Sequence, residues 1–171
     1  MLHLLKRELA IPTVGFNTNA ILIGRLTPMV AEGLIDRLVI GLDYVDGRVS
    51  KHSPIGVSSR TILATILALK RAGQDIAIAA VYNGDYLRFE KLVNWCLAND
   101  VTLKVLEVSD DKIACRTTKL FTRMISQTIE RFSLDLAEIP AVGDYYGMKG
   151  GVPRIYFFHS HCRLRECGLC G

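Results

Sequence analysis

The chain of 171 residues lacks an apolar run long enough to cross a lipid bilayer. A membrane-spanning helix needs roughly 20 apolar residues, and apolar runs such as Ile76–Tyr82 are much shorter. The first segment, Met1–Pro12, contains Lys6, Arg7 and Glu8 and has no apolar core that would indicate a secretory signal. These absences predict a cytoplasmic protein without a membrane partner.

A strong charge of either sign is also missing. Lys and Arg number 21, Asp and Glu number 17, and the formal net charge is +4. That balance permits an anionic ligand but does not indicate a nucleic acid partner. Half of the residues are apolar and 22% are charged, which excludes a disordered chain and suits a domain with a sizeable core.

The sequence has no phosphate-binding loop. Gly147–Gly151 is rich in glycine, but no strand leads directly into it and no helix follows, whereas nucleotide-binding loops need both. We therefore expect the longer stretch Gly143–Gly151 to be a flexible loop. A Ser/His/Asp or Cys/His catalytic set cannot be derived from spacing, because such sets are assembled in space.

What the sequence does contain is an alternation of apolar strands and amphipathic helices. The strands are predicted at Ile11–Asn17, Leu38–Leu42, Ile76–Val81, Val101–Val108 and Arg154–Phe158. The helices are predicted from Thr27-Pro28 to Gly33, from Ser58 or Ser59 to Gly73, from Asp85 to about Ala98, and around Leu120–Phe132. This order predicts an α/β fold with a parallel sheet covered by helices. Periodicity leaves open whether the sheet is doubly wound or part of a barrel.

The last two helices have apolar residues at helical spacing, which predicts their buried sides. In the helix after Asp85 these residues are Leu87, Leu92, Trp95 and Cys96. In the helix around Leu120–Phe132 they are Leu120, Met124, Ile125, Ile129 and Phe132, with the polar Thr128 at the same spacing.

Short polar residues follow the predicted strands, at the edge where parallel α/β folds bind ligands. They include Thr18 and Asn19 after the first strand, Asp43 after the second, Asn83 after the third and Glu107 at the end of the fourth. Such side chains can hydrogen-bond a polar small molecule. The alternative is that they only form turns and cap helices.

Three of the five cysteines lie within the last ten residues, as Cys162, Cys167 and Cys170. His161 precedes them directly. In a cytoplasmic protein, clustered cysteines bind metal or carry out redox chemistry more often than they form disulfides. Three thiolates suit an iron–sulfur cluster, and thiolates with an imidazole suit zinc. The alternative is a reduced tail without metal.

Several segments in their order resemble the radical S-adenosylmethionine superfamily, and within it the GTP 3′,8-cyclase branch of molybdenum cofactor biosynthesis. Gly15–Leu22 is similar to the family's strand that ends in Thr-Asn-Gly, and Ile35–Tyr44 resembles its strand that ends in Ser-Leu-Asp. Ile76–Asn83 and Val101–Val108 resemble the next two strands. Arg154–Cys170 resembles the segment leading into a second iron–sulfur site.

The resemblance implies the C-terminal half of a partial (β/α)6 barrel in residues 1–111, followed in residues 112–171 by a C-terminal extension with the cysteines. It also implies S-adenosylmethionine and a [4Fe–4S] cluster as cofactors, with Thr18 and Asn19 near S-adenosylmethionine. Asp43 and Glu107 would lie at strand ends, and the three clustered cysteines would hold the second cluster. The substrate would be a small molecule or nucleotide.

The chain also departs from the family pattern. The CxxxCxxC loop that holds the radical-generating cluster is absent, and its place would be upstream of residue 11. Ala20 and Gly41 replace the expected glycine and serine, and Ala79 and Ala80 stand where polar or basic residues are expected. We therefore predict an enzyme that is incomplete as this chain alone. The alternatives are a non-catalytic half-barrel that binds metal, a nucleotide or a partner, and an unrelated doubly wound protein with a zinc knuckle. Because a half-barrel has open sheet edges, we expect a homo-oligomer or a partner chain.

Overall fold

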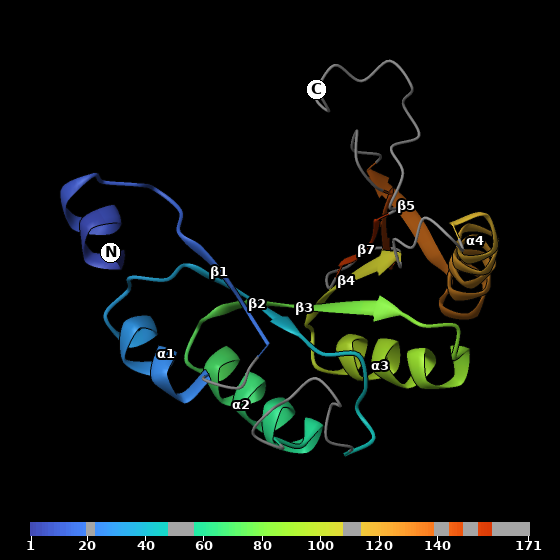
Figure 1. Ribbon diagram of the computed structural model, residues 1–171, viewed down its shortest axis with the longest axis horizontal. Coiled ribbons are helices and arrows are strands. Elements are labelled where there is room, and N and C mark those ends of the chain that lie inside the picture. The colour runs from blue at the N-terminus through green and yellow to red at the C-terminus, as the bar shows by residue number, and fades with distance from the viewer. Residues whose placement is uncertain (20–22, 48–56, 108–113, 139–143, 149–153, 159–171) are drawn as a thin grey trace. The chain divides into compact units, whose positions relative to one another are not determined.

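A computed structural model of the chain describes residues 1–19, 23–47, 57–107, 114–138, 144–148 and 154–158. The chain divides into two compact units, Met1–Ile78 and Ala79–Gly171 (Figure 1). The division falls inside one strand, β3 (Asp75–Tyr82), so each unit contains part of it. Within the described residues, no helix has the length and apolar character needed to cross a membrane.

The first unit begins with a five-residue π-helix, Leu4–Glu8. It continues with β1 (Gly15–Thr18), α1 (Ile23–Ala31), β2 (Arg37–Gly41), α2 (Ser59–Arg71) and the start of β3. The strand order in this unit is β1-β2-β3. β1 and β2 are parallel, with Phe16 opposite Leu38 and Thr18 opposite Ile40.

Local sequence signals explain where the helices of this unit start and stop. Ser58 caps α2, because its Oγ accepts a hydrogen bond from the Thr61 amide at 3.3 Å. Gly33 and Gly73 follow the ends of α1 and α2 with φ of +66° and +86°, a conformation that glycine adopts without steric cost. Both glycines were predicted as helix ends, and the prediction is confirmed.

The second unit contains the end of β3, α3 (Tyr86–Ala98), β4 (Thr102–Glu107) and α4 (Ala114–Phe132). Three strands follow: β5 (Leu134–Glu138), β6 (Asp144–Met148) and β7 (Arg154–Phe158). The strand order in this unit is β3-β4-β7-β6-β5. β7 is parallel to β4, whereas β6 is antiparallel to both β7 and β5.

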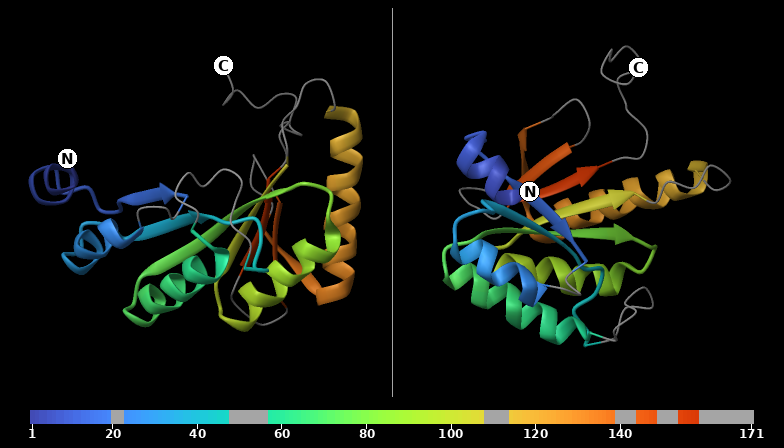
Figure 2. Two further views of the ribbon diagram at one scale, coloured as in Figure 1. Left: turned by 60° about the horizontal axis from the view of Figure 1, so that its bottom comes forward. Right: turned by 60° about the vertical axis from the view of Figure 1, so that its left-hand side comes forward.

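One face of the sheet in the second unit is packed against α3 and α4 (Figure 2). Ile155 and Phe157 on β7 are at most 1% exposed. Phe121 of α4 lies between Phe157 and Tyr82, with ring centroids 6.4 Å from each. Phe89 of α3 also contacts Tyr82 edge-on at 5.5 Å. The core of this unit is therefore built around a chain of aromatic rings.

The predicted α/β class is confirmed: a parallel sheet of five strands, β1 to β4 and β7, is flanked by helices. The division between residues 111 and 112, expected from the resemblance, stays a prediction.

One prediction about the later part of the chain is wrong, and one strand there was missed. Within the expected loop Gly143–Gly151, residues Asp144–Met148 form strand β6, because they pair with both β5 and β7. The strand β5 was not predicted at all. β6 owes its place to pairing with the strands that come directly before and after it in the chain, and such pairing does not require a strong propensity within the strand itself.

The start of α1 was also predicted wrongly. Thr27-Pro28 was expected to begin the helix, but α1 begins at Ile23 and Pro28 lies inside it. Proline lacks the amide that would bond to the carbonyl four residues before it, so it weakens a helix interior without excluding it. Here the carbonyl of Pro28 still accepts the Glu32 amide at 2.9 Å, which continues the helical pattern to its C-terminal end.

The burial predicted from helical spacing is wrong for two leucines. Leu87 and Leu120 were expected in the core, but they are 71% and 43% exposed. The side of α4 that packs inward is instead marked by Phe121, which is 1% exposed, and by Met124, which is fully buried. Leu92, Cys96, Ile125 and Thr128 are buried as predicted, while Trp95, Ile129 and Phe132 are half-buried.

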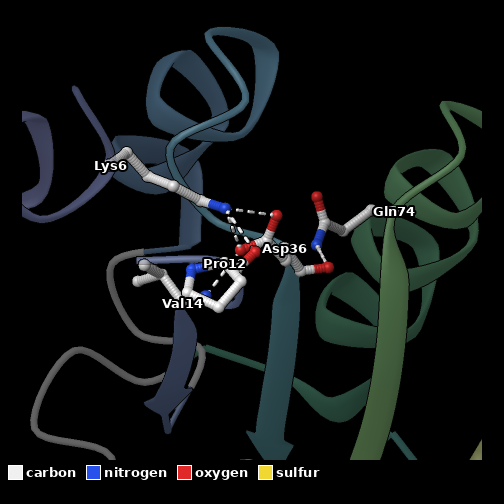
Figure 3. Close-up of polar contacts among 5 residues, drawn as sticks. All are labelled: Lys6, Pro12, Val14, Asp36 and Gln74. Carbon is white, nitrogen blue, oxygen red and sulfur yellow. Dashed lines mark hydrogen bonds and ion pairs between the residues drawn. The ribbon is translucent and has the colours of Figure 1, made fainter. Parts of the chain in front are cut away.

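At the N-terminal ends of its strands, the first unit contains a polar network centred on Asp36 (Figure 3). Lys6 Nζ lies 2.8 and 2.6 Å from the two carboxylate oxygens of Asp36, and it also donates to the Pro12 carbonyl at 3.0 Å. The Val14 amide donates to the same carboxylate, and Gln74 donates to the Asp36 carbonyl. The hydrogen bond from Lys6, followed by that from Val14, holds the pKa of Asp36 below its ordinary value. These contacts fasten the N-terminal segment to the sheet.

Candidate functional site

The opposite, C-terminal edge of the first unit contains three of the predicted site residues. Thr18 ends β1, Asn19 follows it, and Asp43 lies two residues beyond the end of β2. Thr18 and Asp43 are half-buried and Asn19 is exposed. The parallel pairing of β1 and β2 brings these strand ends to one edge, as the sequence predicted.

Gly41, the last residue of β2, lies directly beside this edge. A Cβ atom at Gly41 would lie 3.7 Å from the Thr18 carbonyl oxygen and 3.8 Å from the Asn19 Cα, which is ordinary van der Waals contact. The glycine therefore leaves the backbone at the end of β1 less covered than a larger residue would. The edge combines a carbonyl, an amide side chain and a carboxylate, which are acceptors for a cationic or hydroxyl-bearing ligand.

In the second unit, the structure gives Asn83 a role in a turn. The Asn83 Oδ1 accepts a hydrogen bond from the Asp85 amide at 3.2 Å, and Asp85 in turn caps α3 by accepting from the Arg88 amide at 3.1 Å. The prediction that a helix begins at Asp85 is confirmed by this cap. The contacts of Asn83 match the alternative in which the residues after a strand form turns.

Glu107 ends β4 but lies on the helix-covered face of the sheet. Glu107 is on the same side of β4 as Leu103 and Val105, which are both fully buried. The intervening residues Thr102, Lys104 and Leu106 are on the other side. Glu107 itself is 7% exposed. A carboxylate that is buried at a strand end has little contact with solvent, so we expect it to interact with neighbouring protein groups.

Sequence reasoning missed Tyr82, the last residue of β3. Burial raises the pKa of Tyr82, and the nearby Asp85 and Tyr86 raise it further, while Arg123 lowers it. The hydroxyl of Tyr86 is buried and makes no hydrogen bond within the described part of the chain. The sequence signal for these tyrosines is their position around the end of β3, next to Asn83, Gly84 and Asp85.

The predicted metal ligands Cys162, Cys167, Cys170 and His161 lie outside the described residues. Within the residues that the structure does describe, no group of three His, Cys, Asp or Glu side chains could hold a metal ion. Cys96 is buried in the second unit, and burial raises the pKa of its thiol far above the ordinary value, which keeps it protonated and unreactive.

Two solved structures share the fold of this chain. One is SuiB from Streptococcus suis, with 19% sequence identity, a TM-score of 0.58 and coverage of 92% of this chain. The other is SuiB bound to S-adenosylmethionine, with 18% identity, the same TM-score and the same coverage. In both cases the chain spans only 35% of the solved protein. The similarity shows an α/β fold consistent with a partial half-barrel.

No protein-family model matches the sequence. No curated protein matches it either.

Proposed function

We propose that this chain binds S-adenosylmethionine through the C-terminal edge of β1 and β2. The observation that carries the proposal is the shared fold with SuiB over 92% of the chain, since SuiB has been solved with S-adenosylmethionine bound. The motif order adds to it: Thr18-Asn19 and Leu42-Asp43 stand where the radical S-adenosylmethionine family has its strand-end motifs. We therefore assign the chain to that superfamily, in the GTP 3′,8-cyclase branch.

The oxygen acceptors at this edge fit the proposed ligand. S-adenosylmethionine has an ammonium group, a sulfonium centre and two ribose hydroxyls, all of which favour oxygen acceptors. Asp43 offers a carboxylate, Thr18 a carbonyl and a hydroxyl, and Asn19 an amide. Gly41 leaves room for the ligand to approach the backbone. Asn83 and Glu107, in the second unit, stay predicted ligand contacts.

Radical chemistry would need an iron–sulfur cluster, which supplies the electron that cleaves S-adenosylmethionine to a 5′-deoxyadenosyl radical. Cys162, Cys167 and Cys170 are the proposed ligands of the second cluster of the branch. The role of this chain's own described residues is to bind and orient the cationic cofactor. The chain spans about a third of the solved proteins it resembles, so catalysis by the whole enzyme, and its nucleotide or other small-molecule substrate, are part of the proposal.

Calorimetric titration with S-adenosylmethionine tests the proposed site. We expect Asp43→Asn to weaken binding by about tenfold, since a charge-assisted hydrogen bond contributes roughly 1.5–3 kcal/mol and Asn retains part of it. Asp46→Asn removes a carboxylate from the same loop and is the matched control. No binding by the unaltered chain, or equal losses in both variants, would overturn the proposal.

A non-catalytic metal-binding half-barrel is the second candidate. The replacement of the family's serine by Gly41, and of an expected polar residue by Ala79, favours it. Anaerobic reconstitution with iron and sulfide separates the two candidates by metal analysis and by the broad visible absorption of a cluster. One zinc per chain without a cluster would support the zinc knuckle, and an absence of both would remove the metal proposals.

We also propose that β1 pairs with a further strand, from a second copy or a partner chain. β1 is the edge strand of the first unit, and its four residues include neither a charge nor a proline. Sedimentation equilibrium tests the pairing: Asn17→Lys places a charge on the exposed edge and should shift an oligomer toward the monomer. Asn94→Lys, on the exposed side of α3, should not. A monomer at all concentrations would contradict self-association.

A further inference from the structure

The N-terminal segment of the first unit exposes a group of apolar side chains. Among the described residues, nine large apolar side chains are exposed, and four of them lie within the first eleven residues. Met1 is 89% exposed, Leu9 57%, Leu4 43% and Ile11 38%. The short helix in this segment has no buried residue. Exposed apolar surface that is gathered in one place commonly marks an interaction site.

The basic side chains of the same segment are turned toward the rest of the first unit. Lys6 is paired with the Asp36 carboxylate and has only 15% of its side chain exposed (Figure 3). His3 lies 3.2 Å from a carboxylate oxygen of Glu32, and Arg7 donates to the Glu32 carbonyl at 3.5 Å. A surface helix ordinarily buries its apolar side chains and exposes its charged ones. The arrangement here is the reverse, which leaves the apolar side chains available to a partner outside the chain.

The backbone of the short helix aligns two of these apolar side chains. Leu4–Glu8 is a π-helix, and the Leu9 amide donates to the Leu4 carbonyl at 2.9 Å. Because the hydrogen bonds of a π-helix join residues five apart, Leu4 and Leu9 follow one another along nearly the same side. In an α-helix, with about 3.6 residues per turn, they would be about 140° apart. We call Leu4 and Leu9 the leucine ridge.

The exposed charges next to the leucine ridge are opposite in sign. Arg7 and Glu8 are adjacent in the sequence, and both are exposed. A partner with a strong charge of one sign would be attracted by one of them and repelled by the other. A second copy of the segment offers both signs, and a two-fold axis can bring Arg7 of each copy beside Glu8 of the other. The segment is therefore complementary in charge to itself.

A membrane surface suits the segment less well than a second copy does. Amphipathic helices that lie on membranes have Lys and Arg residues on their polar face, and anionic lipids attract these residues. Lys6 is instead paired with Asp36, and Glu8 adds a negative charge to the exposed surface. The segment therefore has little excess positive charge to attract an anionic lipid.

We propose that the leucine ridge packs against the leucine ridge of a second copy of this chain, in a dimer with two-fold symmetry. Leu4 and Leu9 supply the apolar contact, and the pairs between Arg7 and Glu8 set its direction. Stable interfaces bury about 1,200–2,000 Å² in total, and so short a segment covers only part of that area, so the dimer is weak. The contact uses no residue of β1. It depends neither on the proposed pairing of that strand nor on S-adenosylmethionine.

Sedimentation equilibrium over a wide range of protein concentration tests the dimer. We expect Leu9→Glu to raise the dissociation constant by about tenfold or more, because each copy then places a carboxylate in the apolar contact. Leu87→Glu makes the same change at a leucine of the second unit that is 71% exposed, and it is the matched control. Leu9→Met keeps an apolar side chain and should retain the dimer. Monomers at all concentrations, or equal weakening by Leu9→Glu and Leu87→Glu, would overturn the proposal.

An exchange of charges tests the two-fold arrangement. Arg7→Glu and Glu8→Arg each bring like charges together across the axis, so each should weaken the dimer several-fold. The double variant restores opposite charges and should restore the affinity. An equal mixture of the two single variants should form the mixed dimer in preference to either pure dimer, because only the mixed dimer has opposite charges at both contacts. Additive losses in the double variant would contradict the two-fold contact.

The result is distinguishable from the outcome for β1. Asn17→Lys should weaken a dimer formed through β1 and leave a dimer formed through the leucine ridge unchanged. A dimer that responds to Asn17→Lys but not to Leu9→Glu would support the pairing of β1 and overturn the leucine-ridge dimer. Binding to vesicles of phosphatidylserine and phosphatidylcholine that Leu9→Glu abolishes would also overturn it, because lipid would then cover the ridge.

Discussion

The two units of the chain differ in what fills their cores. Among the described residues, the fully buried side chains of Met1–Ile78 are aliphatic, such as Leu38, Ile40 and Ile66. Those of Ala79–Gly171 include Phe121 and Phe157, linked ring to ring. A core of small aliphatic groups spreads its stabilisation over many contacts, whereas an aromatic core concentrates it in a few large side chains.

The two units also differ in how a helix at their periphery is attached. The N-terminal helix Leu4–Glu8 has no buried residue and is held by polar contacts, chiefly Lys6 with Asp36 and His3 with Glu32. The longest helix of the second unit, α4, is held by the buried residues Phe121, Met124 and Ile125. The attachment of the N-terminal segment should therefore depend on pH and salt, while the attachment of α4 should not.

The largest predicted effect concerns the aromatic core. Phe121→Ala should lower the free energy of unfolding by about 3–5 kcal/mol, because it removes a buried ring and leaves a cavity between Tyr82 and Phe157. Ile66→Val, at a fully buried site of the first unit, should cost about 0.5–1.5 kcal/mol. Urea unfolding monitored by circular dichroism measures both, and a loss of less than about 2 kcal/mol for Phe121→Ala would contradict the central place of this ring in the core of the second unit.

Acid should weaken the first unit through Asp36. Its pKa is lower in the fold than the ordinary 3.8, so its ionised form stabilises the fold above pH 3.8. That contribution is lost as the pH falls through the lower pKa of the folded state. Asp36→Asn should accordingly reduce the thermal midpoint at pH 6 and make no difference at strongly acidic pH. A difference that does not change with pH would contradict this.

Helix caps should contribute equally to the stability of the two units. Ser58→Ala and Asp85→Ala each remove a side chain that accepts a backbone amide at the start of α2 or α3. Each should cost about 1 kcal/mol in the free energy of unfolding. Ser58→Thr and Asp85→Asn retain an acceptor and should cost less than half as much in the same chemical denaturation.

The smallest predicted effect is that of a surface ion pair in the second unit. Arg131 Nε lies 2.9 Å from Glu90 Oε1, and the arginine side chain is 68% exposed. Exposed pairs contribute about 0–1 kcal/mol, so Arg131→Met should change stability by less than either cap. A larger loss than that of Phe121→Ala would show that polar contacts, rather than the aromatic core, stabilise the second unit.

Much of the fold could be predicted because the relevant signals are local. Ser58 and Asp85 cap their helices, and Gly33 and Gly73 follow helix ends, as their positions in the sequence indicated. The strand-end residues Thr18 and Asp43 could be found for the same reason, since a residue's place after a strand depends only on where that strand stops.

Other features could not be predicted because they depend on how segments pair and pack rather than on signals within one segment. The strand Asp144–Met148 has little local strand signal and owes its place to pairing on both sides. Leu87 fits the helical spacing of a buried residue, yet none of the described elements covers it, and it is 71% exposed.

Local signals suffice for the α/β class, the order of most elements and the strand ends at which polar residues gather, because backbone preferences, capping and hydrophobic periodicity act within a few residues. Packing of distant segments places β7 beside β4, Glu107 on the buried face, and Tyr156 and Phe158 on the same face as Lys104. These outcomes depend on the pairing of strands about 50 residues apart. Closing such a long loop costs conformational entropy, and this cost is offset only when the whole sheet forms.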